Sequence, residues 1–437
     1  MSQYLTKSNE KLIPQIALVI RPCLRSEAKQ LQELRLAETK SLVSTIGLKV
    51  SACEAVRMDR FTASSLLGTG KIAEIGIRIS NDKVVLVVVD GTLTPLQQRT
   101  LEKHWSCKVI DRTGLILEIF GARAKTSEGK LQVELAALTY QRSRLVRSWT
   151  HLERQRGGVG FLGGPGEAQL ESDRRQIDVR IKGLKQSLSA VKRTRSLHRK
   201  GRKRVPYPII ALVGYTNAGK STLFNQLTGA DVLVADKLFA TLDPKMRAAR
   251  LPSGREVIYS DTVGFVSELP TTLIAAFRAT LEEVVEADLI VHVRDMAHTD
   301  NQTQRSDVLT VLGEILPQFS EDDPPLEALN KVDLVSEQNR RFLAQITSRK
   351  CNEVALSAKT GKGCYDLQSA IDRRLSKNDR VVDIRVDLKD GNAIAWLYAN
   401  GSVLDRKDDD SYAYFRVSLT SDNHGRFQNR TNSIETN

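Results

Sequence analysis

A chain of 437 residues is too long for a single hydrophobic core, so we expect two to four domains. Hydrophobic content of 41% and charged content of 27% are those of an ordinary soluble protein. No stretch approaches the roughly 18 apolar residues of a membrane helix, and Met1–Glu10 lacks the apolar core of a signal peptide. Five scattered cysteines without a CxxC pair argue against zinc and for a reducing compartment, so we expect a cytoplasmic protein.

The balance of charge is more informative than the composition. The chain has 65 Lys and Arg residues against 52 Asp and Glu residues, a net charge of +13. Such an excess favours a polyanionic partner, either nucleic acid or an anionic membrane surface. A basic surface that is merely solvated fits the same numbers equally well.

Strand and helix patterns alternate in the first part of the chain, which predicts a parallel sheet with helices on its faces. We assign this N-terminal α/β domain to residues 1–125. Within it, the stretch GTGK at 68–71 suggests a second phosphate loop, but it lacks the P-loop spacing and this is the weaker interpretation. The predicted strands are Gln15–Ile20, Leu48–Cys53, Val84–Val89 and Cys107–Ile110, and the predicted helices are Glu27–Ile46 and Pro95–His104.

Two long amphipathic stretches occupy residues 126–205. Their apolar residues recur at spacings of three and four, which places each set on one face of a helix. Between them the run RGGVGFLGGPGE at 156–167 cannot be helical. We predict a long antiparallel helical hairpin, whose glycine-rich tip is either a flexible connection or a backbone shaped to approach a ligand closely. The two stripes are Leu131, Leu135, Leu138, Leu145, Trp149 and Leu152, and Leu170, Ile177, Ile181, Leu184, Leu188 and Val191.

The hairpin leads into Lys192–Arg204, where eight of thirteen residues are Lys or Arg. Such blocks are often solvated linkers, but at a domain boundary of a basic protein we interpret this one as a nucleic-acid contact. Apolar strands return from Pro206, and we assign residues 206–378 to the next domain. A small α+β domain, 379–437, contains strand-like runs at Val381–Leu388 and Tyr412–Leu419 around a helix over Ala393–Tyr398.

A phosphate-binding loop follows the apolar strand Ile209–Val213. GYTNAGKST and the helical pattern after it provide the strand–loop–helix context that the sequence G-x-x-x-x-G-K-S requires. Glycines let backbone N–H groups surround the phosphates at a helix N-terminus, Lys220 would reach the outer phosphates, and the Ser221 hydroxyl would ligate Mg²⁺. The predicted binding residues here are Gly214, Tyr215, Thr216, Asn217, Ala218, Gly219, Lys220, Ser221 and Thr222.

A second box, NKVD at 330–333, predicts guanine as the base. The Asp333 carboxylate can accept from both the N1–H and the N2 amino group of guanine, a pair of donors that adenine lacks. Asn330 can bond the base and the P-loop region, and the stem of Lys331 can lie along the base plane. A backbone N–H of the downstream SAK run can meet guanine O6. The predicted base-binding residues are Asn330, Lys331, Val332, Asp333, Ser357, Ala358 and Lys359.

Two segments between these boxes are candidate switches. Thr241 is either the second hydroxyl ligand of Mg²⁺ or an ordinary loop threonine, and Asp261 can hold the ion through water. The Gly264 N–H can meet the γ-phosphate, so the loop after it can sense GTP. The candidate catalytic residues are Lys220, Thr241 and Gly264, and the candidate metal ligands are Ser221 and Thr241. The full switch set is Phe239, Ala240, Thr241, Leu242, Asp261, Thr262, Val263 and Gly264.

Phe265 stands where Ras-like switches carry a water-orienting glutamine. Phenylalanine cannot polarise water, so we expect it to pack as an apolar anchor, and we expect slow hydrolysis that a partner stimulates. Asn217 resembles the P-loop asparagine that ligates K⁺ in several other GTPases, and the alternative is a side chain that only stabilises the loop.

GYTNAGKST, LFATLDP and DTVGF together resemble the HflX family of translation-factor-like GTPases. The likeness covers most of residues 15–375, and outside the GTPase domain it rests on SLLGTGKIAEIG (65–76), IDRTGLILEIFGARAKTSEGKLQVELA (110–136) and WTHLERQRGGVGFLGGPGEAQLESDRR (149–175). Two departures lie at the hairpin tip: Arg156 stands where the family pattern has glycine, and Ala168 where it has threonine.

The resemblance implies a ribosome-associated GTPase that uses GTP and Mg²⁺, and K⁺ if Asn217 is a ligand. It would bind the RNA and proteins of the large ribosomal subunit as a monomer and separate stalled or idle ribosomes into subunits. One rival is an RNA-binding ribosome-assembly factor that uses GTP as a conformational latch without splitting anything. Another is a signalling or membrane GTPase, but the chain shows no lipidation motif and we expect no membrane anchor.

Overall fold

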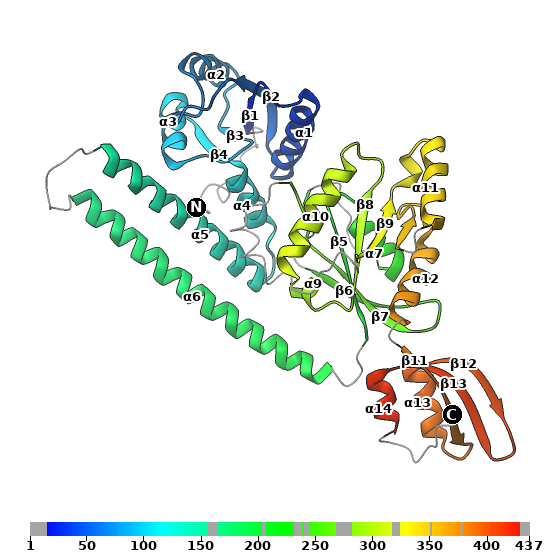
Figure 1. Ribbon diagram of the computed structural model, residues 1–437. Helices are drawn as coiled ribbons and strands as arrows, with labels where there is room; N and C mark the ends of the chain where they lie inside the picture. The colour runs from blue at the N-terminus through cyan, green and yellow to red at the C-terminus, as the bar shows by residue number, and fades with distance from the viewer. Residues whose placement is uncertain are drawn as a thin grey trace. The chain divides into compact units, whose positions relative to one another are not determined.

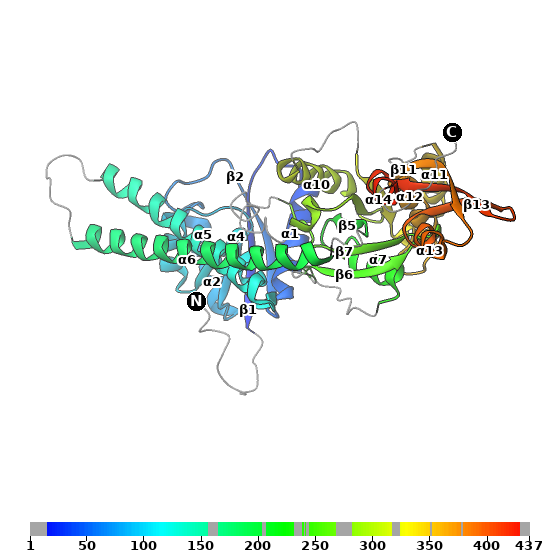
Figure 2. The same cartoon turned by 90° about the horizontal axis from the view of Figure 1, so that it is seen from below.

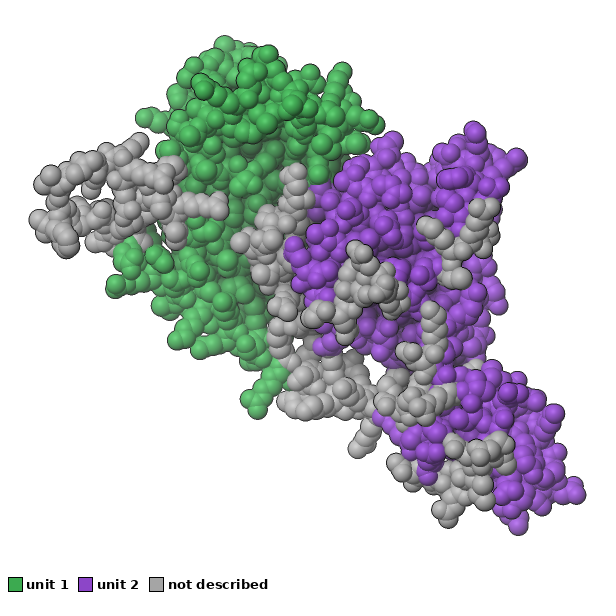
Figure 3. All heavy atoms as spheres, viewed as in Figure 1, with its two compact units in different colours: residues 1–201, 235–243, 268–280 green, residues 202–234, 244–267, 281–437 purple. Residues whose placement is uncertain are grey.

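By its internal contacts the chain divides into two compact units (Figure 3). The first contains the described residues up to Gly201 together with Leu238, Phe239 and Thr241, and the second contains all the other described residues. None of the described helices has both the length and the apolar composition needed to cross a membrane. The computed structural model describes residues 15–155, 165–202, 207–230, 238–239, 241, 244–267, 282–316, 324–349, 352–376 and 379–428.

A parallel four-stranded sheet of order β2-β1-β3-β4 forms the core of the first unit (Figure 1). The two inner strands are apolar where they pair, and Leu18, Val19, Val87 and Val88 are completely buried, as expected of strands covered on both faces. The elements are β1 (Ile16–Leu24), α1 (Lys29–Thr45), β2 (Lys49–Met58), α2 (Thr69–Asn81), β3 (Leu86–Val89), α3 (Pro95–Trp105), β4 (Lys108–Asp111) and α4 (Arg112–Arg123).

Polar side chains cap the N-termini of two of these helices. The Thr94 side chain accepts from the Gln97 backbone N–H, the Gln97 side chain accepts in return from the Thr94 N–H, and Pro95 occupies the first helical position of α3. The Asp111 carboxylate accepts from the Gly114 N–H and begins α4. Residues of high cap propensity therefore fix where both helices begin, and α4 starts directly at the end of β4.

The predicted elements of this domain are present with shifted ends, and two helices were missed. β2 is longer than predicted because it pairs with β1 all the way to Met58. α2 was overlooked although Ile72, Ile75 and Ile79 bury one face of it. The GTGK stretch is the start of this helix, and Lys71 forms ion pairs of 2.7 Å with Glu54 and Glu74, which argues against a phosphate loop there. α4 was also not predicted.

Helices α5 (Ser127–Gln155) and α6 (Pro165–Arg202) lie side by side in both views and form the predicted hairpin (Figures 1 and 2). Arg142 pairs with Asp178 at 3.0 Å and Arg180 pairs with Glu134 at 2.7 Å, so the helices are antiparallel. The tip, with Arg156, lies outside the described residues, as do most side chains of the basic block and that of Ala168.

The predicted stripe is correct on α6 and incomplete on α5. Ile181, Leu184 and Leu188 of α6 are buried as predicted. On α5 the most buried apolar side chains are instead Val133 and Ala136, because this helix also packs on α3 and α4 of the N-terminal domain. The predicted Leu131, Leu135 and Leu138 are half-buried.

A six-stranded sheet of order β10-β9-β8-β5-β7-β6 dominates the second unit, and only the edge strand β6 is antiparallel to its neighbour. Central β5 pairs with β7 on one side and with β8 on the other. Ligands bind at the carboxyl edge of such sheets where the strand order reverses. The elements are β5 (Ile209–Gly214), α7 (Lys220–Thr228), β6 (Lys245–Arg250), β7 (Glu256–Asp261), α9 (Glu282–Val285), β8 (Leu289–Asp295), α10 (Asn301–Ile315), β9 (Leu326–Asn330), η2 (Val332–Leu334), α11 (Glu337–Arg349), β10 (Glu353–Ala355) and α12 (Cys364–Leu375).

The C-terminal domain is an antiparallel sheet of order β11-β13-β12 with two helices. Leu397, Phe415, Val417 and Phe427 form its core and are at most 2% exposed. β12 and α14 were not predicted, because the edge strand SVLDRKD is mostly polar. The predicted fold class is confirmed: a parallel α/β domain, an antiparallel helical hairpin, a P-loop GTPase domain and a small α+β domain. The C-terminal elements are β11 (Asp379–Asp387), α13 (Gly391–Asn400), β12 (Ser402–Asp408), β13 (Tyr412–Thr420) and α14 (Ser421–Gln428).

Candidate nucleotide-binding site

The predicted boxes lie at the carboxyl edge of the six-stranded sheet. Gly214 ends β5, Asp261 ends β7 and Asn330 ends β9, while Ser357 comes two residues after β10. Parallel strands end at the same edge of a sheet, so residues far apart in the sequence meet there. Asp295, which sequence reasoning did not select, ends β8 between them.

Two P-loop glycines are required by close approaches of other strands. A Cβ on Gly214 would lie 2.2 Å from the Val293 carbonyl oxygen, and a Cβ on Gly219 would lie 2.3 Å from Asn330 Nδ2. Both residues also have positive φ angles, 149° and 93°. Glycine at these positions therefore lets the loop turn tightly and leaves its N–H groups at the N-terminus of α7.

Lys220 is buried at the base of this loop. Its Nζ donates to the carbonyl oxygens of Gly214 at 3.1 Å and Tyr215 at 2.8 Å. Burial lowers the pKa of Lys220 to about 8, although the nearby Asp261 charge opposes the shift. Phosphate oxygens would stabilise the ammonium form, so the residue suits a polyphosphate ligand.

Ser221 and Asp261 provide the oxygen donors that Mg²⁺ prefers. The Ser221 hydroxyl donates to Asp261 Oδ2 at 2.7 Å, and the Asp261 residue is completely buried. The hydroxyl at the start of α7 and the carboxylate at the end of β7 fit a hard cation that would also bind phosphate oxygens. The other predicted ligand, Thr241, is buried and belongs to the first compact unit.

Phe239, two residues before Thr241, packs within the first unit. Its ring lies edge-on to Phe120 of α4, with centroids 4.6 Å apart and planes at 77°. Both side chains are almost completely buried. Ala240 and Leu242 lie outside the described residues.

The segment after β7 lies directly on the P-loop. The Thr262 hydroxyl donates to the Leu212 carbonyl at 2.7 Å, and Gly264 packs so closely on Thr216 that a Cβ would lie 2.7 Å from Thr216 Cγ2. Val263 is buried. Phe265 is 4% exposed, as an apolar anchor requires.

Asn330 connects the three boxes. Its Nδ2 donates to the Ala218 carbonyl at 2.8 Å, and its Oδ1 accepts from the Ala358 N–H at 2.9 Å. Asn330 is 2% exposed, so both bonds are shielded from water. Asn330 thereby joins the P-loop to the SAK run, and Ser357 beside it is also buried.

The other residues predicted to bind the base belong to the same two segments, 330–333 and 357–359. Lys331 adopts φ = 63° and pairs with Asp295 at 2.7 Å, a contact that the position of Asp295 at a strand end could have indicated. Val332 is buried, and Asp333 lies on the short helix η2. Among the described residues the Asp333 carboxylate has no hydrogen-bond partner, so both oxygens can accept from a base. Asn217 and Lys359 are exposed, and Thr222 is half-buried on α7.

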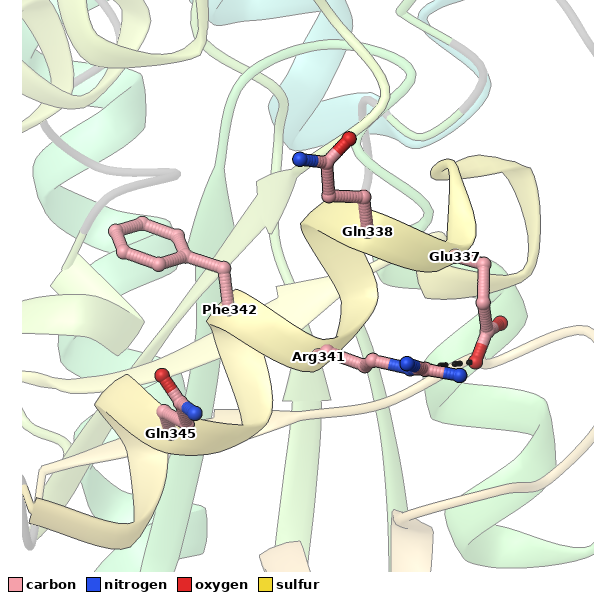
Figure 4. Close-up of a pocket in the computed structure, with 5 residues that line it drawn as sticks. All are labelled: Glu337, Gln338, Arg341, Phe342 and Gln345. Carbon is pink, nitrogen blue, oxygen red and sulfur yellow. Dashed lines mark ion pairs between the residues drawn. The ribbon is translucent and has the colours of Figure 1, made fainter.

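A separate shallow pocket of about 390 Å³ lies along α11 (Figure 4). All of its lining residues belong to that helix, and Phe342 among them is 61% exposed. The pocket contains none of the predicted nucleotide-binding residues. It is lined by Glu337, Gln338, Arg341, Phe342 and Gln345.

Four family models match successive parts of the chain: GTP-binding GTPase N-terminal (33–121), GTP-binding GTPase Middle Region (123–202), 50S ribosome-binding GTPase (209–331) and HflX C-terminal domain (342–436). The chain is 46% identical over 393 residues to the GTPase HflX of Magnetococcus marinus, and the match covers 90% of each protein. The chain belongs to the HflX family of GTPases.

Other comparisons with this HflX-family protein cover similar lengths. It is 43% identical over 375 residues to the GTPase HflX of Escherichia coli, which covers 85% of this chain and 86% of the relative. Among solved structures, it is similar to a GTP-binding protein from Sulfolobus solfataricus in complex with GDP, with 22% identity and a TM-score of 0.44 over 83% of this chain and 99% of that one. The family that the motifs predicted is confirmed, and GTP hydrolysis is the activity of this class of protein.

Proposed function

We propose that this HflX-family GTPase binds the large ribosomal subunit and uses GTP to separate stalled or idle ribosomes into subunits. The observation that carries the proposal is the match of residues 209–331 to the 50S ribosome-binding GTPase model, over the part of the chain that holds the P-loop and Asn330, which is bonded to it. The net charge of +13 supports a partner rich in RNA phosphates.

The residues predicted to contact the phosphates and Mg²⁺ have separate roles in this proposal. Lys220 would bind the outer phosphates, Ser221 and Thr241 would ligate Mg²⁺, and Asp261 would hold the ion through water. When bound, Mg²⁺ would supply positive charge next to the phosphate oxygens, and Gly264 would donate its N–H to the γ-phosphate. The 2.7 Å contact between Ser221 and Asp261 and the burial of Lys220 support these assignments.

We further propose that residues 1–125 and the hairpin 126–205 act together as the main ribosome-binding part, with 206–378 as the switch. Asp111 joins the first two parts: it accepts from the Tyr140 hydroxyl at 2.7 Å and pairs with Arg144 at 3.4 Å. Arg144 also donates to the Leu93 carbonyl at 3.1 Å. These contacts fix α5 on the N-terminal domain, which supports a hairpin that moves with that domain.

Hydrolysis by the isolated protein is proposed to be slow, because the buried Phe265 has no polar group to orient water. The ribosome, or K⁺ held by Asn217, would complete catalysis. Turnover is measured with and without ribosomes, in potassium and in sodium buffer at constant ionic strength. Fast turnover of the isolated protein in sodium buffer would contradict stimulation, and equal rates in both salts would exclude the ion.

The deciding experiment is sedimentation of purified ribosomes with the full-length protein and GTP, a non-hydrolysable GTP analogue or GDP. With GTP or the analogue, we expect ribosomes to separate and the protein to sediment with large subunits; with GDP we expect neither. Lys220→Ala should lose the effect, whereas Lys389→Ala, an exposed lysine of the C-terminal domain, should keep it. Binding to large subunits without separation of ribosomes would instead favour the assembly-factor function.

A further inference from the structure

Two buried hydrogen bonds join the P-loop to the segment after Gly264. The Tyr215 phenol donates to Ser267 Oγ at 2.8 Å and accepts from the Ser267 backbone N–H at 2.6 Å. Tyr215 is 7% exposed and Ser267 is 3% exposed. A single phenolic oxygen therefore holds both the main chain and the side chain of Ser267, and burial shields both bonds from water.

The backbone on either side is paired as well. The Phe265 N–H donates to the Gly214 carbonyl at 3.1 Å, and the Thr216 N–H donates to the Phe265 carbonyl at 2.7 Å. β5 and β7 pair Leu212 with Asp261, whereas this bridge pairs Tyr215 with Phe265. Tyr215 lies three residues after Leu212, whereas Phe265 lies four residues after Asp261. The segment between Asp261 and Phe265 therefore contains one extra residue and forms a bulge.

The bulge places Gly264 against the phosphate-binding lysine. A Cβ on Gly264 would lie 2.9 Å from Thr216 Cα and 3.0 Å from Lys220 Nζ. The bond from Thr262 to the Leu212 carbonyl holds the start of the bulge, and the bonds from Tyr215 to Ser267 hold the chain beyond its end. Gly264 is therefore fixed from both sides.

We propose that Tyr215 is a positioning residue of the nucleotide site, whose bonds to Ser267 hold the Gly264 N–H where the γ-phosphate of GTP would lie. This inference rests on the proposed GTP site. An N–H already in place adds a charge-assisted hydrogen bond for GTP and none for GDP, which lacks that phosphate. Without the Tyr215 bonds, the segment that contains Gly264 would become ordered only when the γ-phosphate binds. The loss of conformational entropy would then weaken the binding of GTP but not that of GDP.

The test is Tyr215→Phe in the full-length chain, which keeps the ring and removes both bonds. Dissociation constants are measured for GDP and for a non-hydrolysable GTP analogue, with kcat and KM for GTP. We expect the analogue to bind about three- to tenfold more weakly while GDP binding changes less than about twofold, and kcat to fall by a similar factor. The matched control is Tyr259→Phe in β7, a fully buried tyrosine whose hydroxyl has no hydrogen-bond partner among the described residues.

Ser267→Ala is the second variant, because it removes only the bond to the hydroxyl. We expect a smaller loss of the same kind, and no further loss when it is combined with Tyr215→Phe. The inference would be overturned if Tyr215→Phe weakened the binding of GDP and of the GTP analogue equally. It would also be overturned if the folded variant kept the unsubstituted protein's ratio of the two dissociation constants. Failure of the unsubstituted chain to bind either nucleotide would contradict the proposed function instead.

Discussion

Asn330→Ala tests whether one buried amide holds the nucleotide site together. The substitution removes the donor to the Ala218 carbonyl and the acceptor for the Ala358 N–H, and both lost partners lie in buried surroundings. A buried polar group left without a partner costs about 1–3 kcal/mol, so the two together cost roughly 2–6 kcal/mol. If the free energy of GDP binding is weakened by the lower value, about 2 kcal/mol, the dissociation constant for GDP rises about 30-fold.

GDP and a GTP analogue should weaken by the same factor, because Asn330 contacts the P-loop and the base side of the site rather than the γ-phosphate end. Fluorescent-nucleotide titration measures both dissociation constants. Thermal melting shows how much of the lost hydrogen-bond energy lowers the stability of the folded protein. Asn339→Ala, an exposed asparagine of α11, is the control and should change neither. Affinity within about twofold of the unsubstituted protein, at an unchanged melting temperature, would refute the reasoning.

Three further predictions concern the base, the phosphates and the core. Asp333→Asn should move preference from GTP toward xanthosine triphosphate, measured by competition binding; comparable affinity of the unsubstituted protein for ATP and GTP would contradict the guanine assignment. The pKa of Lys220 is lowered to about 8, so GDP affinity should fall by up to about tenfold per pH unit above pH 8, because binding then requires proton uptake. Stability without nucleotide should rise over the same range, since the unfolded chain keeps its proton to higher pH; affinity independent of pH up to 9.5 would disprove the shift. Glu327→Gln should destabilise the domain by about 3–5 kcal/mol in urea unfolding, because the buried Glu327 carboxylate pairs at 2.6 Å with both Arg294 and Arg305, whereas the exposed Glu337→Gln should change it by less than about 0.5 kcal/mol.

The kind of site could be predicted from the sequence alone, because phosphate and guanine recognition depend on short contiguous runs. The P-loop needs two glycines, a lysine and a hydroxyl at set spacing, and NKVD places an amide and a carboxylate within four residues. The strand–helix alternation likewise indicated a parallel sheet. Elements without a clear periodic pattern escaped prediction: α4 contains the almost continuously apolar run LILEIF, and the edge strand β12 is mostly polar.

Which of these residues meet became clear from the three-dimensional fold. Asn330 reaches Ala218 across 112 residues because β9 and β5 end at one edge of the sheet. The same strand order brings the Val293 carbonyl so close to residue 214 that only glycine fits, and a one-residue bulge brings Ser267 to Tyr215. Local patterns set the direction of each strand's side chains, but register and strand order follow from packing between distant segments, and no periodicity within either segment contains that information.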